Sequence, residues 1–385
     1  MADSRSPLQP ALDRFMLNFF KNQLEKDPNA NIFFSPFNIE LAYSMMIGGS
    51  RGSTRDEIIK TLCFNNSQLT PEIIIKEFQK ISNLYKEGTP DSTLLSNNLL
   101  AISKKFNVKP EFMKMVKDYK TTILNENFDD PAKVQTKLNS LIAEKTKNVI
   151  PKVLDEAPDK NTAMMMLNTM YFKGMWNQSF NPNDNTTYYF FNADGTRRDI
   201  PFMWTKDIIY CRSAVLMERN KKFIHAVELF YKDSISFYFL KPIEDYIPMD
   251  IVKKVDDYLF LLLNSTRPHH LNLIAMPRIK INQSYELDKI LPTMGMKLPF
   301  TDKADFSGIS NEKLKVTKSI HKTVVEIQTQ SSQAAEANYV RHRRRVDIAK
   351  NHLQINVFYI QRPFMFLIRD RSNSITLFAG IINTL

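Results

Sequence analysis

Residues 321–345 read His321-Lys-Thr-Val-Val-Glu-Ile-Gln-Thr-Gln-Ser-Ser-Gln-Ala-Ala-Glu-Ala-Asn-Tyr-Val-Arg-His-Arg-Arg-Arg345. The β-branched residues at the start predict a strand, and the small polar residues that follow are too hydrophilic to form a core. No glycine occurs between Gly308 and Gly380, so this region has few positions that adopt positive φ easily. We therefore expect a strand that leads into a long, extended loop, which displays the basic cluster 341–345 as a protease substrate does.

Length and composition favour one large domain. The chain has 385 residues, of which 43% are hydrophobic, so it can bury a substantial core. No Gly/Ser-rich or Pro-rich linker, internal repeat or low-complexity block divides it, and we expect a single α+β domain over residues 1–385. The apolar run at 259–263 is shorter than the roughly 20 residues that span a membrane, and the first residues lack an apolar signal core. We expect a soluble monomer.

The chain is basic, with a net charge of +11. Lysines recur from position 104, at Lys104, Lys105 and Lys109, and either a polyanion partner or a solvated face explains them. The solvated face is favoured, because Glu111 and Asp118 interrupt the series and no nucleic-acid motif accompanies it. We expect no nucleic-acid partner.

The cysteine content leaves the redox setting open. Cys63 and Cys211 are the two cysteines, so one disulfide is the most that the chain can form. A core of this size does not need that bond, and two buried thiols are the favoured interpretation.

Helix signals concentrate in the first half of the chain. Ser35-Pro36 predicts the start of a helix over 37–47, and Asp130-Pro131 the start of one over 131–147. Thr54 and Glu57 have the spacing of a capping box and predict a further helix start.

Strand signals concentrate in the second half. The apolar run 162–174 predicts a central strand that is buried on both faces. The short β-rich runs are separated by turns, which favours sheets over bundles. These runs are 271–280, 315–328, 363–369 and 375–383. The whole pattern predicts a sheet-rich α+β fold.

Motifs of catalysis are missing from the sequence. There is no Gly-x-Ser-x-Gly elbow, no His-Glu-x-x-His zinc site, no Cys-x-x-Cys pair and no dinucleotide fingerprint after a strand. His269-His270, next to Pro268, is expected in an exposed loop. We therefore expect a binding or inhibitory protein without cofactor or metal, and not an enzyme.

Six motifs in a fixed order show a family resemblance. They are Asn31-Ile-Phe-Phe-Ser-Pro-Phe-Asn-Ile39, Leu167-Asn-Thr-Met-Tyr-Phe-Lys-Gly-Met-Trp176, Ala304-Asp-Phe-Ser-Gly308, Ser319-Ile-His-Lys-Thr323, Arg362-Pro-Phe-Met-Phe366 and Leu377-Phe-Ala-Gly380. In this combination the chain resembles the serpins over nearly its whole length, and its amino terminus is similar to the intracellular, ovalbumin-like branch.

The resemblance implies three β-sheets, eight or nine helices and an exposed reactive-centre loop at about 329–357. Such a protein is a suicide pseudo-substrate of serine endopeptidases, because its cleaved loop enters the largest sheet as an extra strand while the protease is still bound as an acyl-enzyme. The alternatives are a non-inhibitory serpin-fold chaperone or carrier, and a serpin that is merely cleaved.

The resemblance also assigns residues beneath the largest sheet. Ser35, Asn168 and His321 form a polar cluster that holds the sheet shut or lets it part, and Trp176 lies at its upper opening, the breach. Asn38 stands where the family usually has a second small hydroxyl, so the hydrogen bonds around it are expected to differ. Each of the three cluster residues is equally well explained as a hydrogen-bonded polar group of the core.

The family's usual spacing places Arg345 before the scissile bond and Val346 after it. Arginine fits the pocket of a trypsin-like protease, whose buried carboxylate binds a guanidinium group. Arg344 is the alternative bait, and 341–344 then resembles a furin-type sequence. A plain solvated loop and a sulfated-polysaccharide site remain alternatives for the cluster. The polysaccharide site would use Lys104, Lys105, Lys109, Arg341, Arg343 and Arg344.

The loop hinge departs from the family pattern. The hinge residues are Thr329, Ser331, Ser332, Ala334, Ala335, Glu336 and Ala337. Ser331 replaces the usual glycine, which makes hinge bending harder. Glu336 shares one face of an inserted strand with Ser332, Ala334 and Asn338, and the resemblance makes that face the buried one. Slow or incomplete insertion is therefore expected.

The place of action follows from weak signals that conflict. The amino terminus favours the cytoplasm, whereas a trypsin-like bait is of more use outside cells. We expect an extracellular protein that leaves by a route without a cleaved signal peptide, with the cytoplasm as the alternative.

Overall fold

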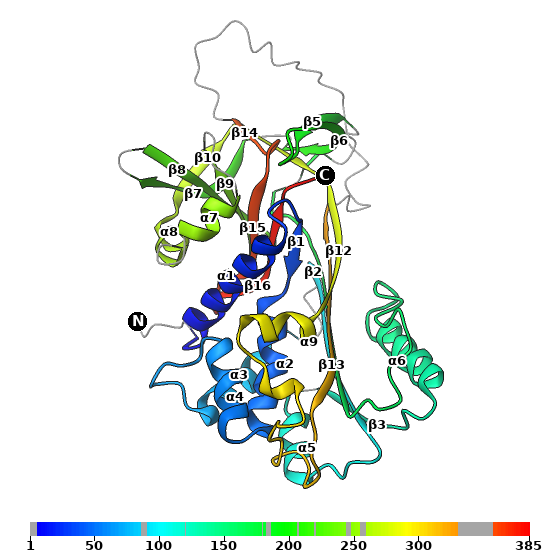
Figure 1. The fold of residues 1–385 in the computed structure, drawn as a ribbon. Helices are drawn as coiled ribbons and strands as arrows, with labels where there is room; N and C mark the ends of the chain where they lie inside the picture. The colour runs from blue at the N-terminus through cyan, green and yellow to red at the C-terminus, as the bar shows by residue number, and fades with distance from the viewer. Residues whose placement is uncertain are drawn as a thin grey trace, which may run out of the picture.

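The computed structural model describes residues 6–85, 91–119, 121–178, 180–181, 186–205, 208–218, 221–243, 248–254, 259–329 and 357–385. In this part of the chain, nine α-helices surround three β-sheets of five, seven and four strands. The expected α+β class and the expected helix number are confirmed. Figure 1 shows the helices α2 to α5 at one end of the molecule and the strands β5, β6 and β14 at the other.

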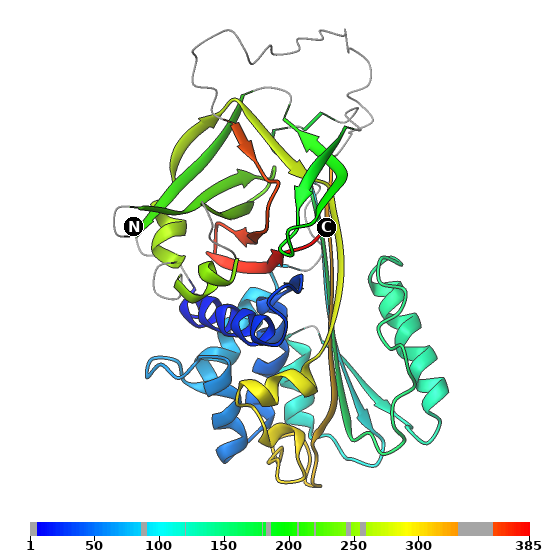
Figure 2. The same cartoon turned by 45° about the horizontal axis from the view of Figure 1, so that its top comes forward.

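The five-stranded sheet runs almost the whole length of the molecule (Figures 1 and 2). Its order is β12 (Ile279–Glu286), β13 (Val316–Ile327), β4 (Met164–Gly174), β2 (Ser92–Ser103) and β3 (Thr122–Glu126). The central pair, β13 and β4, is parallel from Val316 opposite Met164 to Glu326 opposite Lys173. We call this pairing the seam. Their outer neighbours β12 and β2 are antiparallel to them. The strand predicted at 162–174 is confirmed as β4.

The other two sheets lie toward the end of the molecule opposite α3, α4 and α5 (Figure 1). The seven-stranded sheet has the order β1 (Ile32–Phe34), β16 (Ile375–Ile382), β15 (Phe364–Asp370), β9 (Ile235–Pro242), β8 (Lys221–Phe230), β7 (Ile209–Glu218) and β10 (Arg267–Leu271). The four-stranded sheet has the order β14 (Val357–Tyr359), β11 (Leu273–Pro277), β6 (Arg197–Trp204) and β5 (Thr187–Phe191). The prediction of an exposed loop at His269-His270 is wrong, because both residues belong to β10, which pairs with β7.

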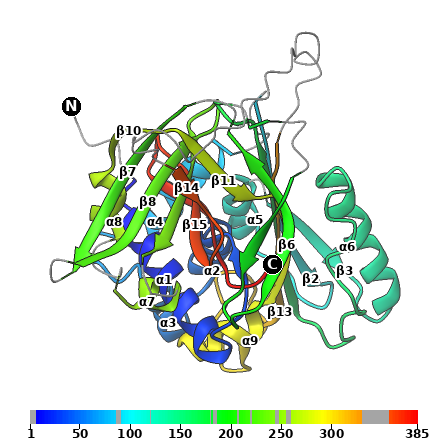
Figure 3. The ribbon, with the colours of Figure 1, turned by 90° about the horizontal axis from the view of Figure 1, so that it is seen from above.

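Helices cover both faces of the long sheet. Seen from above, α6 lies on one side of β2, β3 and β13, and α2 and α5 lie on the other (Figure 3). The helices are α1 (Gln9–Lys26), α2 (Pro36–Gly49), α3 (Gly52–Thr61), α4 (Pro71–Ser82), α5 (Pro110–Lys117), α6 (Pro131–Lys145), α7 (Pro248–Lys254), α8 (Leu259–Ser265) and α9 (Leu287–Ile290). The sheet is therefore buried between two apolar clusters, of which the smaller lies under α6.

Two of the three predicted helix starts are confirmed. The Ser35 side chain accepts a hydrogen bond from the Asn38 amide, and the Asp130 side chain accepts one from the Lys133 amide. The helix start predicted from the capping-box spacing of Thr54 and Glu57 is wrong, since α3 already begins at Gly52. Both side chains serve tertiary contacts instead: the Thr54 hydroxyl accepts from the Asp305 amide, and the Glu57 carboxylate accepts from the amides of Lys297 and Leu298.

The core contains a buried carboxyl group. Glu40 on α2 is fully buried, and within the described residues neither of its side-chain oxygens has a hydrogen-bond partner. Burial, and next the nearby Asp13 carboxylate, hold the pKa of Glu40 well above its usual range. An unpaired buried polar group lowers the stability of a fold, so α2 carries a built-in destabilising residue beneath the long sheet.

We predict that Glu40→Met stabilises the protein at pH 8 by about 1–3 kcal/mol, because an apolar side chain of similar length removes the buried polar group. A raised pKa means that the unfolded chain ionises first, so the stability of the wild type falls as the pH rises above 4.5, the usual pKa of a glutamate. This part of the pH dependence is absent from the variant. Denaturant unfolding at several pH values measures both effects, and equal or lower stability of Glu40→Met would contradict the prediction.

Candidate functional site

The strand β13 leads directly into the loop predicted to carry the bait. β13 ends at Ile327, and the backbone oxygen of Gln328 accepts a hydrogen bond from the Trp176 indole nitrogen at 3.2 Å. The indole ring stacks on the Tyr231 ring, with 4.3 Å between ring centres. Trp176 thus ties the end of β13 to the end of β4, at the top of the seam.

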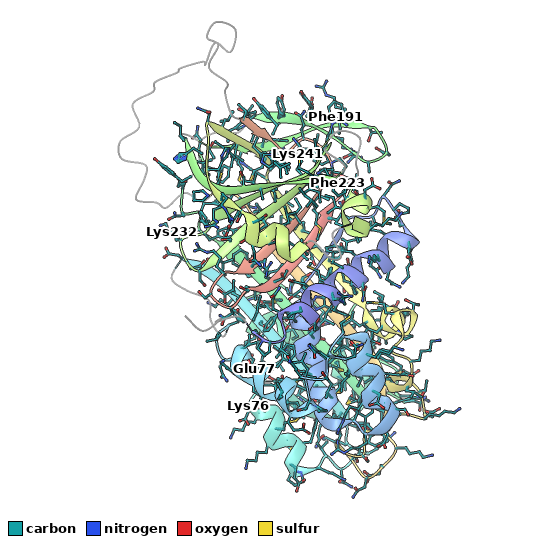
Figure 4. All side chains as sticks on the ribbon, turned by 90° about the vertical axis from the view of Figure 1, so that its left-hand side faces the viewer. Lys76, Glu77, Phe191, Phe223, Lys232 and Lys241 are labelled. Atoms are coloured by element: carbon teal, nitrogen blue, oxygen red, sulfur yellow. The ribbon has the colours of Figure 1, made fainter. Side chains whose placement is uncertain are left out.

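The chain that follows the loop is held by its own strand pairing and side-chain contacts. β14 pairs in parallel with β11, and the Lys241 ammonium group donates to the backbone oxygen of Tyr359 at 2.8 Å. Burial, and next the nearby Arg362, lower the pKa of Lys241. The Arg362 guanidinium group lies over the Phe191 ring at 5.1 Å. Figure 4 shows Lys241 and Phe191 together at the β-rich end, far from Lys76 and Glu77 on α4.

A buried polar cluster lies beneath the middle of the seam. His321 accepts a hydrogen bond from the Ser35 amide at its Nε2 atom, at 3.0 Å. The Ser35 hydroxyl donates to the backbone oxygen of Leu377 at 2.6 Å and accepts from the Asn38 amide at 3.0 Å. The predicted residues Ser35, Asn38 and His321 are therefore brought together by β1, α2 and β13.

Asn168 lies beside His321 across the seam, but its side chain is hydrogen-bonded to β2, the neighbour of β4 on the other side. The two residues face each other in the register of β4 and β13. The Asn168 side-chain amide donates to Asn98 on β2 at 2.7 Å. Within the described residues, Asn168 Oδ1, His321 Nδ1 and Asn38 Nδ2 are buried and have no hydrogen-bond partner. Side-chain hydrogen bonds among the described residues therefore do not latch the seam at this level.

The protonation state of His321 follows from its burial. Burial lowers the pKa of His321 to about 3, so the ring is neutral at physiological pH. Its Nε2 atom accepts a hydrogen bond, which places the ring proton on Nδ1. The unpartnered Nδ1 atom is therefore a donor, and the unpartnered Asn168 Oδ1 is an acceptor.

We predict that acid weakens the closed sheet through His321. The pKa of His321 in the fold, about 3, is below 6.5, the usual pKa of a histidine, so the unfolded chain binds the proton first and stability is lost as the pH falls below 6.5. The loss is about 1.4 kcal/mol for each pH unit. Denaturant unfolding between pH 7 and pH 4 should show a shallower slope for His321→Gln. His270→Gln, at an exposed position, is the control. The prediction is contradicted if the slope of stability against pH is the same in His321→Gln, in His270→Gln and in the wild type.

The predicted polyanion residues are only partly described. Lys104 and Lys105 are exposed beyond the end of β2, where Lys105 pairs with Asp129 at 3.0 Å. The Lys109 ammonium group donates to the backbone oxygen of Ser307 at 2.7 Å. Two of the three lysines thus already have partners.

Most of the predicted loop lies outside the described residues. This holds for the candidate baits Arg345 and Arg344, for Val346, and for the hinge and basic residues Ser331, Ser332, Ala334, Ala335, Glu336, Ala337, Arg341 and Arg343. Thr329 is half-buried and is the last described residue before the loop.

Sequence reasoning missed part of the polar cluster. Ser96 donates to Asn38, and Asn98 accepts from Asn168, both from β2. A signal for them exists, because Ser96-Asn-Asn98 interrupts the apolar run of that strand. The prediction of two buried thiols is half right: both cysteines carry thiols and Cys211 is buried, but Cys63 is partly exposed.

Comparison with known proteins decides the family. The family model described as "Serpin (serine protease inhibitor)" matches residues 10–384. The chain belongs to the serpin family. Among curated proteins, this serpin is 29% identical to the leukocyte elastase inhibitor of Bos taurus over 98% of this chain and 99% of that protein. It is 25% identical to Serpin A9 of Mus musculus, over 97% and 88%.

Solved structures share the fold. Mouse protein-Z dependent protease inhibitor superimposes with a TM-score of 0.85 at 21% identity, covering 98% of this chain and 96% of that one. Thyroxine-binding globulin in complex with thyroxine gives a TM-score of 0.85 at 25% identity, covering 98% and 99%. The serpin fold is thereby confirmed. No helix in the described ranges is long and apolar enough to cross a membrane.

Proposed function

We propose that this serpin inhibits trypsin-like, Arg-specific serine proteases as a suicide pseudo-substrate, with Arg345 as the bait. The observation that carries the proposal is the seam: two parallel strands stand side by side, and the chain leaves one of them directly into the basic loop. A segment that turns back after β13 would run antiparallel to both strands and could pair with each.

The chemistry divides between the protease and this chain. The protease serine attacks the Arg345 carbonyl carbon, the bond to Val346 breaks, and the new amino terminus of Val346 leaves with a proton. An ester then joins Arg345 to the protease. The freed segment enters the seam and carries the protease along, and its catalytic site is distorted before water can release it.

The balance of hydrogen bonds supports insertion. Opening the seam gives up one parallel ladder, and an inserted strand makes two antiparallel ladders in its place. Each net ladder bond contributes roughly 1 kcal/mol. Against this gain, a buried and unpaired Glu336 carboxylate costs several kcal/mol, on the order of three ladder bonds. We infer that insertion is favourable but slowed, so that trapping competes with simple cleavage.

We predict that incubation with trypsin gives two products on a denaturing gel: a covalent band heavier than either protein, and cleaved serpin. Arg345→Ala should lower the rate of complex formation by more than about tenfold, since it removes a charge-assisted contact worth about 1.5–3 kcal/mol.

Arg344→Ala is the matched control for this experiment and should keep the heavier band. The reverse pattern would identify Arg344 as the bait and favour furin-type convertases. Absence of the band with every Arg-specific protease tested would end the inhibitory proposal.

We predict that Glu336→Ala increases the trapped fraction severalfold, because it removes the carboxylate from the buried face of the inserted strand. The ratio of heavier band to cleaved product measures this effect. The neighbouring substitution Ala335→Ser, on the opposite face, serves as control and should leave the ratio unchanged. A fall in the trapped fraction of Glu336→Ala would place Glu336 on the exposed face.

A second candidate function is that of a non-inhibitory carrier or chaperone. Glu336 and Ser331 favour it, and the structural relative that is named for binding thyroxine has the same fold. Cleavage without any trapped complex would support this function. We further propose an extracellular place of action, since a trypsin-like bait acts on proteases found there, with the cytoplasm as the alternative. A sulfated polysaccharide is proposed as an additional partner of the basic cluster and of Lys104.

A further inference from the structure

A cavity of about 590 Å³ lies at the end of the seam where β4 and β13 begin. Its lining residues come from the loop 153–159 between α6 and β4, from the first residues of β13, from the end of β12 and from α9. Figures 1 and 2 show α9 on one side of the lower half of β13 and α6 on the other. Pockets that hold small organic molecules typically have volumes of about 300–1,000 Å³, so the cavity is large enough for such a ligand.

One wall of this cavity is apolar. Leu154 and Pro158 of the loop, Met165 of β4 and Ile320 of β13 line it. Leu154, Met165 and Ile320 also belong to the apolar cluster under α6, which holds their side chains in place. The wall therefore spans both strands of the seam and offers a preformed contact surface to an apolar group.

The rim of the cavity is acidic. Four carboxylates and two ammonium groups line the cavity, which gives it a formal charge of −2 within a chain whose net charge is +11. These groups are Asp155, Glu156, Asp159, Glu286, Lys289 and Lys318. An excess of negative charge around a hollow with an apolar wall attracts a cation and disfavours an anion.

Two of the four carboxylates are already paired. Glu286 binds the ammonium groups of Lys289 and Lys318. Asp155 pairs with Lys152 at 3.4 Å. These ion pairs compensate the charges on the side of the rim that β12, β13 and α9 form.

The other two carboxylates, Glu156 and Asp159, belong to the loop. Both residues are exposed, and within the described ranges neither has an ion-pair partner. The Asp159 carboxylate accepts a hydrogen bond from the Asn161 amide at 2.6 Å, which fixes its position in the loop. The loop side of the rim thus presents two uncompensated negative charges beside the apolar wall.

We propose that this cavity binds a small hydrophobic amine. Its ammonium group lies between Glu156 and Asp159, because an ammonium group has three donors and makes charge-assisted hydrogen bonds to both carboxylates. Its apolar part packs against Leu154, Met165 and Ile320. A bound amine therefore contacts β4 and β13 at the same time. This inference does not depend on the inhibition of a protease.

The first test titrates the intact protein with tryptamine in a calorimeter, and in parallel with indole-3-propionate, which has the same ring and the opposite charge. Tryptamine should bind saturably and at least about tenfold more tightly than indole-3-propionate, since only the amine matches the acidic rim. No saturable binding of tryptamine up to about 10 mM would overturn the proposal. Equal or tighter binding of indole-3-propionate would overturn it as well.

Variants of the loop test the position of the ammonium group. Glu156→Gln, at an exposed position, should weaken tryptamine binding at least about fivefold, because it removes one of the two uncompensated charges. Asp155→Asn is the matched control: it removes the same charge from the same loop, but that charge is already paired with Lys152, so the affinity should change by less than about twofold. Ala157→Phe places a large side chain in the cavity and should abolish binding. Unchanged affinity in both Glu156→Gln and Ala157→Phe would overturn the site.

A second measurement locates the apolar part of the ligand. In a protein labelled with ¹³C at the methionine methyl groups, tryptamine should shift the NMR signal of Met165, which Met165→Leu assigns. The signal of Met217, which is 52% exposed on β7, is the control and should not move. Saturable binding without a shift of the Met165 signal would place the amine elsewhere and would overturn the assignment.

Discussion

The rest of this structure depends on the parallel pairing of β13 with β4. The pair continues from Val316 to Glu326, and both outer neighbours are antiparallel to it. Two adjacent parallel strands of this kind can exchange their pairing for two antiparallel pairings if a single extended segment enters between the strands. In the insertion proposed above, the segment that follows β13 would enter there and pair with both strands.

Polar groups, and not only apolar packing, set the stability of the closed sheet. Beneath the seam, His321 and Asn168 lie side by side while each makes its hydrogen bond to another element. Glu40 adds a buried carboxyl group on α2 that has no hydrogen-bond partner among the residues that the structure describes. Such groups lower the stability of the closed form without preventing it, since the two apolar clusters that flank the sheet hold the fold together.

The two ends of the loop are held by different means, which separates their roles. On the upstream side, the indole hydrogen bond from Trp176 to Gln328 and the Lys173–Glu326 ion pair at 3.5 Å join the tops of the two seam strands. On the downstream side, strand pairing, the buried Lys241 ammonium group and the stacked Arg362 fix β14 and its continuation. The insertion proposed above would break the upstream contacts between the two strands and leave the downstream contacts in place.

The sequence by itself determined the elements and their class. Ser35-Pro36 and Asp130-Pro131 fixed helix starts because capping is local, and the apolar run 162–174 fixed a buried strand because its pattern is continuous. The spacing of Thr54 and Glu57 gave a wrong helix start, because their side-chain oxygens accept hydrogen bonds from the amides of Asp305 and Lys297, which are far away in the sequence. Only the tertiary structure decided that the Asn168 side chain bonds to Asn98 and not to His321, and that Glu40 lacks a partner in the described part of the chain. Hydrogen bonds between residues far apart in sequence depend on how strands and helices pack, and no local pattern encodes that packing.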